Sequence, residues 1–166
     1  MDKIRSKYTH PDFQFASFRL SGLAFGIDIK NVKEIIRYRT PEGRIPVIPF
    51  IEGFIAIRGI KVPVIDLRKR FSLKPSFTGA TRIIIASIRS HVAGLTVDGR
   101  IDVSKGYKEA KMAPCKGSSA KPWSNCVEVC VETGKDGVNI IDLELLLTGE
   151  EVSVLKAPKE SLFLKA

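Results

Sequence analysis

The sequence predicts an all-β protein that contains only short helices. Apolar residues recur at every second position in several short runs, which is the periodicity of half-buried strands. Turn-forming residues such as glycine, serine and proline separate these runs. No long helical pattern alternates with the strands, so a Rossmann or phosphate-loop fold is disfavoured and a β-barrel architecture is favoured.

The chain begins with a polar segment and a hairpin. Residues 1–12 have no apolar period and are predicted to form a flexible tail. In FRLSGLAFGIDI, residues 18–29, alternating apolar residues stand on both sides of Ser21 and Gly22. We therefore expect two half-buried strands joined by a tight turn.

The next segment, KNVKEIIRYR at residues 30–39, is predicted to be a short helix. Val32, Ile35 and Ile36 show the i, i+3, i+4 spacing of one helical face. Prolines follow, beginning with Pro41, and because proline removes a backbone donor they end the helix and impose an extended connection.

The middle of the chain is predicted to contain two hairpins. Strands at residues 53–58 and 61–66 meet at the Arg58-Gly59 corner, and a turn of helix follows at residues 68–71. The stretch TRIIIASIRSHVAGLTVDG then predicts a second hairpin with a polar turn between its strands.

The last third combines an irregular segment with a final hairpin. Residues 104–125 have few apolar residues and many lysines, which indicates a functional or a mobile loop. Val127, Val129 and Val131 then alternate with other residues, and the chain turns at TGKDG. A short helix is predicted from Asp142, a favourable N-cap.

The composition is that of one ordinary globular domain. The chain has 166 residues, 44% of them hydrophobic, and no run approaches the ~18 apolar residues of a membrane span. Residues 1–11 lack the apolar core of a secretory signal, so a cytoplasmic location is expected. The three cysteines are odd in number and confined to the last third, which favours reduced thiols over disulfides.

The formal charge of +9 favours an acidic partner, and a basic nucleic-acid-binding β-barrel is the alternative hypothesis. The basic residues are spread along the chain, without the interleaved aromatics that are typical of single-strand binders. A solvated basic surface is therefore favoured, and no nucleic-acid partner is expected.

No combination of residues indicates catalysis. His10 and His91 are too few and too far apart for a zinc site. Cys126 and Cys130 are placed on one predicted strand, with their Cβ atoms too distant for a disulfide. No phosphate loop or nucleophile elbow is present. We expect no enzyme activity, no metal and no cofactor.

Several carboxylates lie near predicted strand ends, where a structural role is the usual one. Asp66, which is followed closely by Arg68, is interpreted as a local ion-pair or turn residue. No pair of carboxylates stands in the opposed environments that acid-base catalysis needs.

Four stretches carry a resemblance to a known family: FRLSGLAFGIDIKNVKEII, RIPVIPFIEGFIAIRGIKVPVIDLRKRF, TRIIIASIRSHVAGLTVDG and GVNIIDLELLLTGEE. In order and spacing they resemble the CheW family, the coupling proteins of bacterial chemotaxis. The match runs from about Phe15 to about Glu151. Its central motif is the Arg58-Gly59 corner followed by PVIDLR at residues 63–68.

The resemblance implies two intertwined five-stranded SH3-like β-barrels around a shared core at residues 13–152. The boundary between the subdomains is expected near residues 72–80, and a C-terminal tail at residues 153–166. The resemblance also implies a non-catalytic adaptor that bridges the cytoplasmic tip of methyl-accepting chemotaxis receptors and the regulatory domain of the histidine kinase CheA. The membrane is then reached only through the receptors. A coupling domain of a larger architecture is a less favoured reading.

The resemblance assigns the receptor contact to Val32, Glu34, Ile35 and Arg58. It assigns the kinase contact to the second subdomain, after Phe71. The arginine fork can bind a carboxylate through two hydrogen bonds, and paired apolar residues can anchor a helical partner. From the residues alone, the two apolar side chains are equally compatible with a core role, and the arginine with a solvated turn.

Gly53 and Gly59 are interpreted as bulge and turn positions. The family carries an asparagine two residues before the arginine of the corner, and Ala56 stands there in this chain. How the corner is held is therefore a question for the structure.

Overall fold

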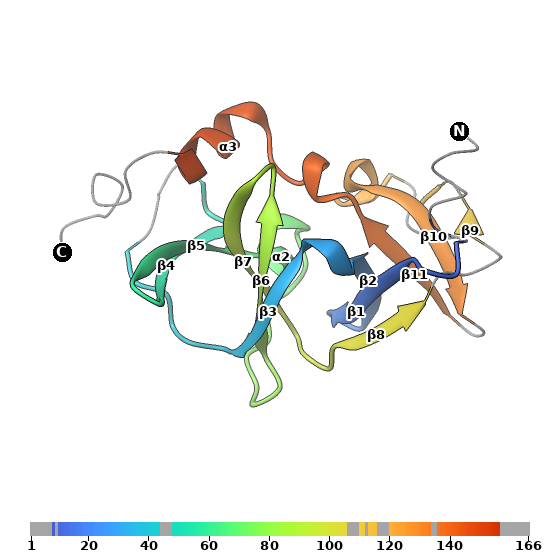
Figure 1. The fold of residues 1–166 in the computed structure, drawn as a ribbon, viewed down its shortest axis with the longest axis horizontal. Helices are drawn as coiled ribbons and strands as arrows, with labels where there is room; N and C mark the ends of the chain where they lie inside the picture. Colours follow the sequence, from blue (N-terminus) through green and yellow to red (C-terminus); the bar gives the residue numbers. More distant parts are fainter. Residues whose placement is uncertain are drawn as a thin grey trace.

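A computed structural model describes residues 8, 10–43, 48–105, 110–111, 113–115, 120–133 and 136–156. They form two β-sheets with short helices between the strands (Figure 1). The prediction of an all-β fold with brief helices is confirmed.

Sheet A has six strands in the order β8-β1-β2-β11-β10-β9. Their bounds are β1 Gln14–Leu20, β2 Leu23–Asp28, β8 Asp102–Lys105, β9 Ala110–Lys111, β10 Val127–Thr133 and β11 Asp136–Ile141. β9 pairs with β10 through two residues only, so this sheet is the expected five-stranded one with a short addition.

Sheet B has five strands in the order β3-β6-β7-β5-β4. Their bounds are β3 Val32–Arg37, β4 Ile51–Ile57, β5 Ile60–Asp66, β6 Arg82–Ile88 and β7 His91–Val97. The helical segments are η1 Ile29–Asn31, α2 Leu67–Arg70, η2 Ser124–Cys126, η3 Leu143–Leu145 and α3 Gly149–Lys156.

The two sheets are intertwined along the chain. Sheet B uses residues 32–97, whereas sheet A is built from strands that precede and follow this segment. In Figure 1 the blue strands β1 and β2 accordingly lie beside the orange β10 and β11, and β2 pairs with β11 in parallel. The expected boundary at residues 72–80 falls between β5 and β6, inside sheet B, and does not separate the two sheets.

The largest apolar cluster is shared by both sheets, as the resemblance implied. It joins Phe25 of β2 with Phe71, which follows α2, and with Trp123. Their ring centroids lie 5.4 to 6.3 Å apart, within the range of favourable aromatic contacts. Each sheet also has a smaller buried cluster of its own. The sheet A cluster consists of Tyr8, Phe13, Phe15, Val129, Val131, Val138 and Ile140, and the sheet B cluster of Ile55, Val62, Val64, Ile83 and Ile85. Burial of apolar surface between the sheets therefore holds them together.

The predicted helix at residues 30–39 is wrong, because this segment forms η1 and strand β3. β3 pairs with β6, and a bulge between Val32 and Glu34 inserts one extra residue into the register. Val32 and Ile35 consequently face the same side of the sheet although they are three residues apart. The bulge thus produced, within a strand, the spacing that we read as a helical face.

The prediction for the cysteines is also wrong. Cys115 and Cys130 form a disulfide, and Cys126 is a buried free thiol in η2 rather than a residue of the strand. The predicted irregular segment 104–125 contains the second half of β8, all of β9 and the start of η2. The pairing was missed because Cys115 lies in that segment, whose path the alternation pattern does not define.

The packed structure extends beyond both predicted boundaries. Tyr8 is 5% exposed and packs against the sheet A cluster, although it lies in the predicted N-terminal tail. Leu155 of α3 is 4% exposed within the shared core, although it lies in the predicted C-terminal tail. Residues 1–7, 9 and 157–166 of these tails lie outside the described part of the chain.

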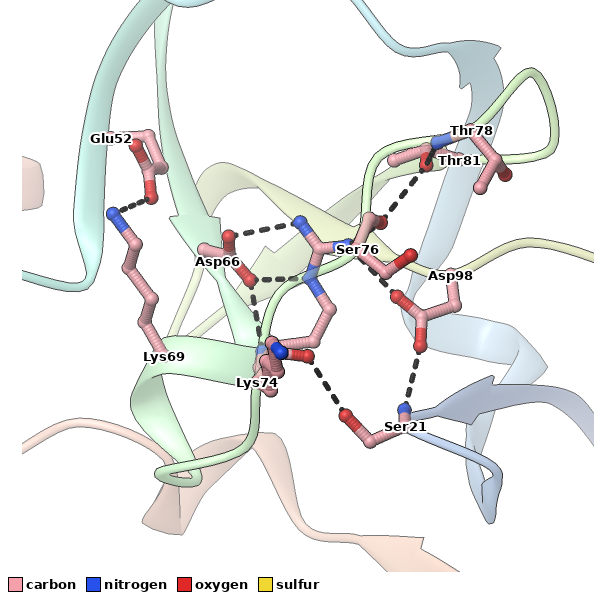
Figure 2. Close-up of polar contacts among 10 residues, drawn as sticks. Ser21, Glu52, Asp66, Lys69, Lys74, Ser76, Thr78, Thr81 and Asp98 are labelled. Carbon is pink, nitrogen blue, oxygen red and sulfur yellow. Dashed lines mark hydrogen bonds and ion pairs between the residues drawn. The ribbon is translucent and has the colours of Figure 1, made fainter.

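A buried ion network joins the two sheets near the end of β5 (Figure 2). The predicted local pair is confirmed: Arg68 Nε lies 2.8 Å from Asp66 Oδ1, and both side chains have no exposed surface. Arg68 Nη1 also lies 2.8 Å from Asp98 Oδ1. Asp98 Oδ2 accepts a hydrogen bond from the backbone N–H of Ser21 in the β1-β2 turn. The network therefore connects sheet B with sheet A.

The protonation of Arg68 follows from these contacts. Burial by itself lowers the pKa of the Arg68 guanidinium, but hydrogen bonds and charges from Asp66 and Asp98 outweigh it and raise the pKa above its usual value. The guanidinium therefore stays charged in the interior of the protein.

Candidate protein-interaction surface

The Arg58-Gly59 corner is a two-residue hairpin turn between β4 and β5. Arg58 has a φ of 48° and Gly59 a φ of 79°, and two successive positive φ values are the mark of a type I′ turn. Ile57 and Ile60 face each other as the last strand pair before the turn. The turn matches the right-handed twist of the strands, and it carries the Arg58 side chain at the tip of the hairpin.

Glu34 of β3 and Arg58 form an ion pair at this tip, between Glu34 Oε2 and Arg58 Nη2. The Arg58 side chain is 77% exposed and that of Glu34 is 31% exposed. An exposed pair of this kind contributes little to stability, because water competes for both charges. It does orient the guanidinium and leaves most of it accessible to another molecule.

Hydrogen bonds to the backbone of β4, rather than the side chain at position 56, hold the corner. The Ala56 side chain is exposed, while its carbonyl accepts a hydrogen bond of 3.0 Å from Arg39 Nη2. Glu42 and Phe54 form an isolated antiparallel bridge close by. The corner is therefore braced by the segment that follows β3, without the family's asparagine.

Gly53 allows that segment to approach β4. Its φ is 135°, and a Cβ at this position would lie 2.1 Å from the Gly43 carbonyl oxygen. The register of β4 against β5 also shifts between Ile51 and Gly53, which indicates a bulge. By contrast, a Cβ at Gly59 would have no neighbour within 4 Å, so backbone conformation alone favours glycine there.

The structure separates the apolar candidates from the charged ones. Directly opposed residues share a face of the sheet, and Ile35 opposes Ile84 of the shared core, whereas Glu34 opposes Ile85 of the sheet B cluster. Ile35 is 43% exposed, and Val32 is partly buried against the shared core. Glu34 and Arg58 therefore lie together, while Ile35 lies on the opposite face of β3.

Ile60 is an apolar neighbour of the corner that sequence reasoning missed. It follows Gly59 directly and is 65% exposed. The two-residue turn could have identified it, because such a turn sets Ile57 and Ile60 opposite each other at the end of the hairpin. The corner thus presents a large exposed apolar side chain two residues after Arg58.

Among the described residues, no cluster of three or more histidine, cysteine or acidic side chains could hold a metal ion. Burial raises the pKa of the Cys126 thiol above its usual value, so this group is a poor nucleophile at neutral pH. None of the helices in the described part of the chain is long and apolar enough to cross a membrane.

Comparison with known proteins identifies the family. A family model described as CheW-like domain matches residues 14–151. The chain belongs to the CheW-like family. The predicted resemblance is confirmed, and the two sheets described above correspond to the two SH3-like barrel subdomains of CheW.

Named relatives agree with this CheW-like assignment. The chain is 35% identical to chemotaxis protein CheW of Bacillus subtilis over 135 residues, which cover 80% of this chain and 85% of the relative. It is 40% identical to chemotaxis protein CheW of Treponema pallidum over 151 residues, or 86% of each chain.

A solved structure supports the same conclusion. The scaffolding protein TtCheW from Thermoanaerobacter tengcongensis superposes with a TM-score of 0.71 at 33% identity, covering 84% of this chain and 96% of the other. The chain is therefore a CheW-like chemotaxis scaffold protein, and the prediction that it is not an enzyme is confirmed.

Proposed function

We propose that this CheW-like protein couples methyl-accepting chemotaxis receptors to the histidine kinase CheA. It binds the cytoplasmic tip of the receptors and the regulatory domain of the kinase, and it catalyses no reaction itself. It acts in the cytoplasm and reaches the membrane only through the receptors. The family membership and the scaffolding role support this proposal, and the shared core supports it further because two binding surfaces can then sit on one rigid body.

The exposed Glu34–Arg58 pair is the observation that carries the receptor side of the proposal. A receptor tip is a helical hairpin bundle, and its recognition requires apolar anchors and a few oriented charges. Arg58 supplies a guanidinium fork that Glu34 holds in place, and Ile60 supplies an exposed apolar side chain two residues further along the chain. Ile35 and Val32 extend the contact on the other face of β3.

The kinase contact belongs to the part of the chain after Phe71. In the structure this part supplies β6 and β7 of sheet B and strands β8 to β11 of sheet A. The receptor candidates Glu34 and Arg58 precede it, in β3 and in the β4-β5 turn. Because β6 and β7 lie between β3 and β5 in sheet B, a kinase contact on the sheet A strands leaves the receptor candidates accessible and lets both partners bind at the same time.

The decisive experiment is a pull-down of the purified protein with a receptor cytoplasmic fragment and with the CheA regulatory domain. We expect both fragments to be retained at low and at moderate salt. Retention of neither fragment contradicts the proposal. The +9 charge adds one rival outcome, which is binding to DNA or RNA that is strong at about 50 mM salt and falls steeply as salt rises.

Arg58→Glu tests the receptor surface, and Arg100→Glu is its matched control. Both arginines are exposed and stand at positive φ, 48° for Arg58 and 50° for Arg100, so the backbone cost of each substitution is similar. We expect Arg58→Glu to weaken receptor binding at least tenfold and to leave kinase binding and the thermal midpoint unchanged. Equal losses of receptor binding in the two variants would remove Arg58 from the receptor contact.

The exchange Glu34→Arg with Arg58→Glu separates two roles of the arginine. The double variant restores the ion pair within the protein but inverts the charge that faces the partner. If Arg58 contacts the receptor, the double variant remains as weak as Arg58→Glu alone. Full recovery of binding would instead mean that the pair acts by holding the corner in shape.

A further inference from the structure

The Cys115–Cys130 disulfide has no role in the scaffold function proposed above. Cys115 precedes η2, and Cys130 lies in the middle of β10, 15 residues further along the chain. Cys115 is 8% exposed and Cys130 is 3% exposed. The bond is therefore covered, with Cys115 as the more accessible of its two residues.

Strand β11 packs closely against this disulfide and accepts a hydrogen bond from Cys115. A Cβ at Gly137 would lie 2.6 Å from the sulfur atoms of both cysteines, so only glycine leaves room for them. Asn139, which opposes Cys130 in the register and is 4% exposed, accepts the backbone N–H of Cys115 at 2.8 Å. One residue makes space for the sulfurs and the other orients the backbone of Cys115.

The loop closed by the disulfide contains Trp123, the single tryptophan of the chain. The indole packs against Phe25 of sheet A, with ring centroids 5.7 Å apart. It also packs against Phe71, the residue after α2, with ring centroids 6.3 Å apart. Its N–H is buried and has no hydrogen-bond partner among the described residues. Within the described residues the ring is held between the sheets by packing, and release into water would give the N–H a partner.

We propose that the Cys115–Cys130 disulfide is a redox-controlled staple that sets how firmly Trp123 is held between the two sheets. In the oxidised protein the closed loop keeps the indole in the joint. In the reduced protein the loop gains freedom, and the indole leaves its site more often. The expectation that the bond cycles in the cell rests on the proposed cytoplasmic location, where protein disulfides are mainly transient or redox-sensing.

The chemistry is thiol-disulfide exchange with a dithiol reductant. One thiolate of the dithiol attacks Cys115 Sγ, the sulfur–sulfur bond breaks, and Cys130 leaves as a thiolate that takes up a proton. The second thiol of the dithiol then displaces Cys115 and closes the disulfide of the reductant. Two electrons pass to the protein, and two thiols replace one disulfide. A disulfide-class oxidant reverses the reaction.

The test follows reduction of the folded, full-length protein by dithiothreitol, with tryptophan emission and thiol alkylation as readouts. We expect the reduction rate to rise in proportion to dithiothreitol concentration and to change little with urea below the unfolding transition, because the reagent reaches the bond without global unfolding. Emission should move to longer wavelength, and oxidised glutathione should reverse the change. A reduction rate that equals the unfolding rate, or that rises with urea as steeply as the global unfolding equilibrium does, would overturn the proposal and leave a purely structural bond.

Two variants complete the design. The double variant Cys115→Ser with Cys130→Ser should resemble the reduced protein in emission and should not respond to dithiothreitol, whereas Cys126→Ser should respond like the wild type. Opening a loop of this length should lower the thermal midpoint by about 6–12 °C. An unchanged emission spectrum and midpoint after full reduction would refute the staple. Because neither receptor nor kinase is present, this outcome is independent of the coupling function.

Discussion

The ends of strands β5 and β11 use the same local structure for different purposes. Each strand pairs in parallel with a strand of a neighbouring hairpin, β5 with β7 and β11 with β2. Each leads into its helical turn through an isoleucine-aspartate-leucine triplet, residues 65–67 and 141–143, and the aspartate caps the helical turn. Asp66 accepts the N–H of Arg68 at 2.9 Å, and Asp142 accepts the N–H of Glu144 at 2.9 Å. The two sheets thus repeat one strand-to-helix transition.

The difference lies in the residue two positions after the aspartate. The Arg68 side chain is completely buried between Asp66 and Asp98, whereas the Glu144 side chain is 66% exposed. Glu144 takes part in the contact between the sheets mainly through its backbone, because its carbonyl accepts two hydrogen bonds from Arg89, of 3.0 and 2.6 Å. The same aspartate cap therefore precedes a buried ion network in sheet B and a solvent-exposed turn in sheet A.

Arg68→Met should produce the largest loss of stability. It leaves the fully buried Asp66 without its cation, and the removal of one partner from a buried pair typically costs about 3–5 kcal/mol. We expect a decrease of that size in the free energy of unfolding, measured by urea denaturation. A loss below about 1 kcal/mol would show that Asp66 does not depend on the arginine.

Asp98→Asn should have the next largest effect, because it acts on the link between the sheets. The carboxylate accepts hydrogen bonds from both Arg68 and the N–H of Ser21, and an amide can accept only on its oxygen. A loss of about 1–3 kcal/mol is expected from the same urea titration. No loss would mean that Arg68 and the N–H of Ser21 do not depend on the charge of Asp98.

Asp142→Ala measures the cap without a buried ion pair. Removal of an aspartate N-cap costs about 0.5–2 kcal/mol, so the variant should be only moderately destabilised. Asp66→Ala is the matched comparison and should cost clearly more, because it also removes the partner of Arg68. Equal values in differential scanning calorimetry would contradict the distinction between the two strand ends.

Glu144→Ala should have the smallest effect. The side chain is exposed, its carboxylate lies 3.8 Å from Arg89, and the main bond to Arg89 uses the backbone carbonyl that alanine retains. A change within about 0.5 kcal/mol is expected from thermal unfolding. A larger loss would assign a structural role to the exposed carboxylate.

Local pattern was sufficient for most of the fold. The hairpin that carries Arg58 and Gly59 was expected to have strands at residues 53–58 and 61–66. The observed strands β4 and β5 begin and end within two residues of these bounds. The β6-β7 hairpin and the cap at Asp142 were also expected, and both are present. Alternation and turn chemistry act within a few residues, so they can be read without knowledge of the tertiary structure.

The candidate site was only partly accessible from the sequence. The resemblance pointed to Glu34 and Arg58, which the structure brings into contact, but it did not place Ile35 on the opposite face of β3 or expose Ile60. These features depend on the bulge in β3 and on the turn that sets the register of β4 and β5. A bulge arises from pairing with a neighbouring strand, which the local sequence of β3 does not contain.

The sequence by itself determined the hairpins and their turns, the cap at Asp142 and the family of this protein. Only the tertiary structure decided that residues 32–37 form a strand, that Cys115 pairs with Cys130, and that Arg68 receives a second carboxylate from Asp98. The partners in these contacts are distant along the chain. Their free energy exists only once segments that are separate in the sequence have come together within a folded sheet, so no local window of residues can reveal it.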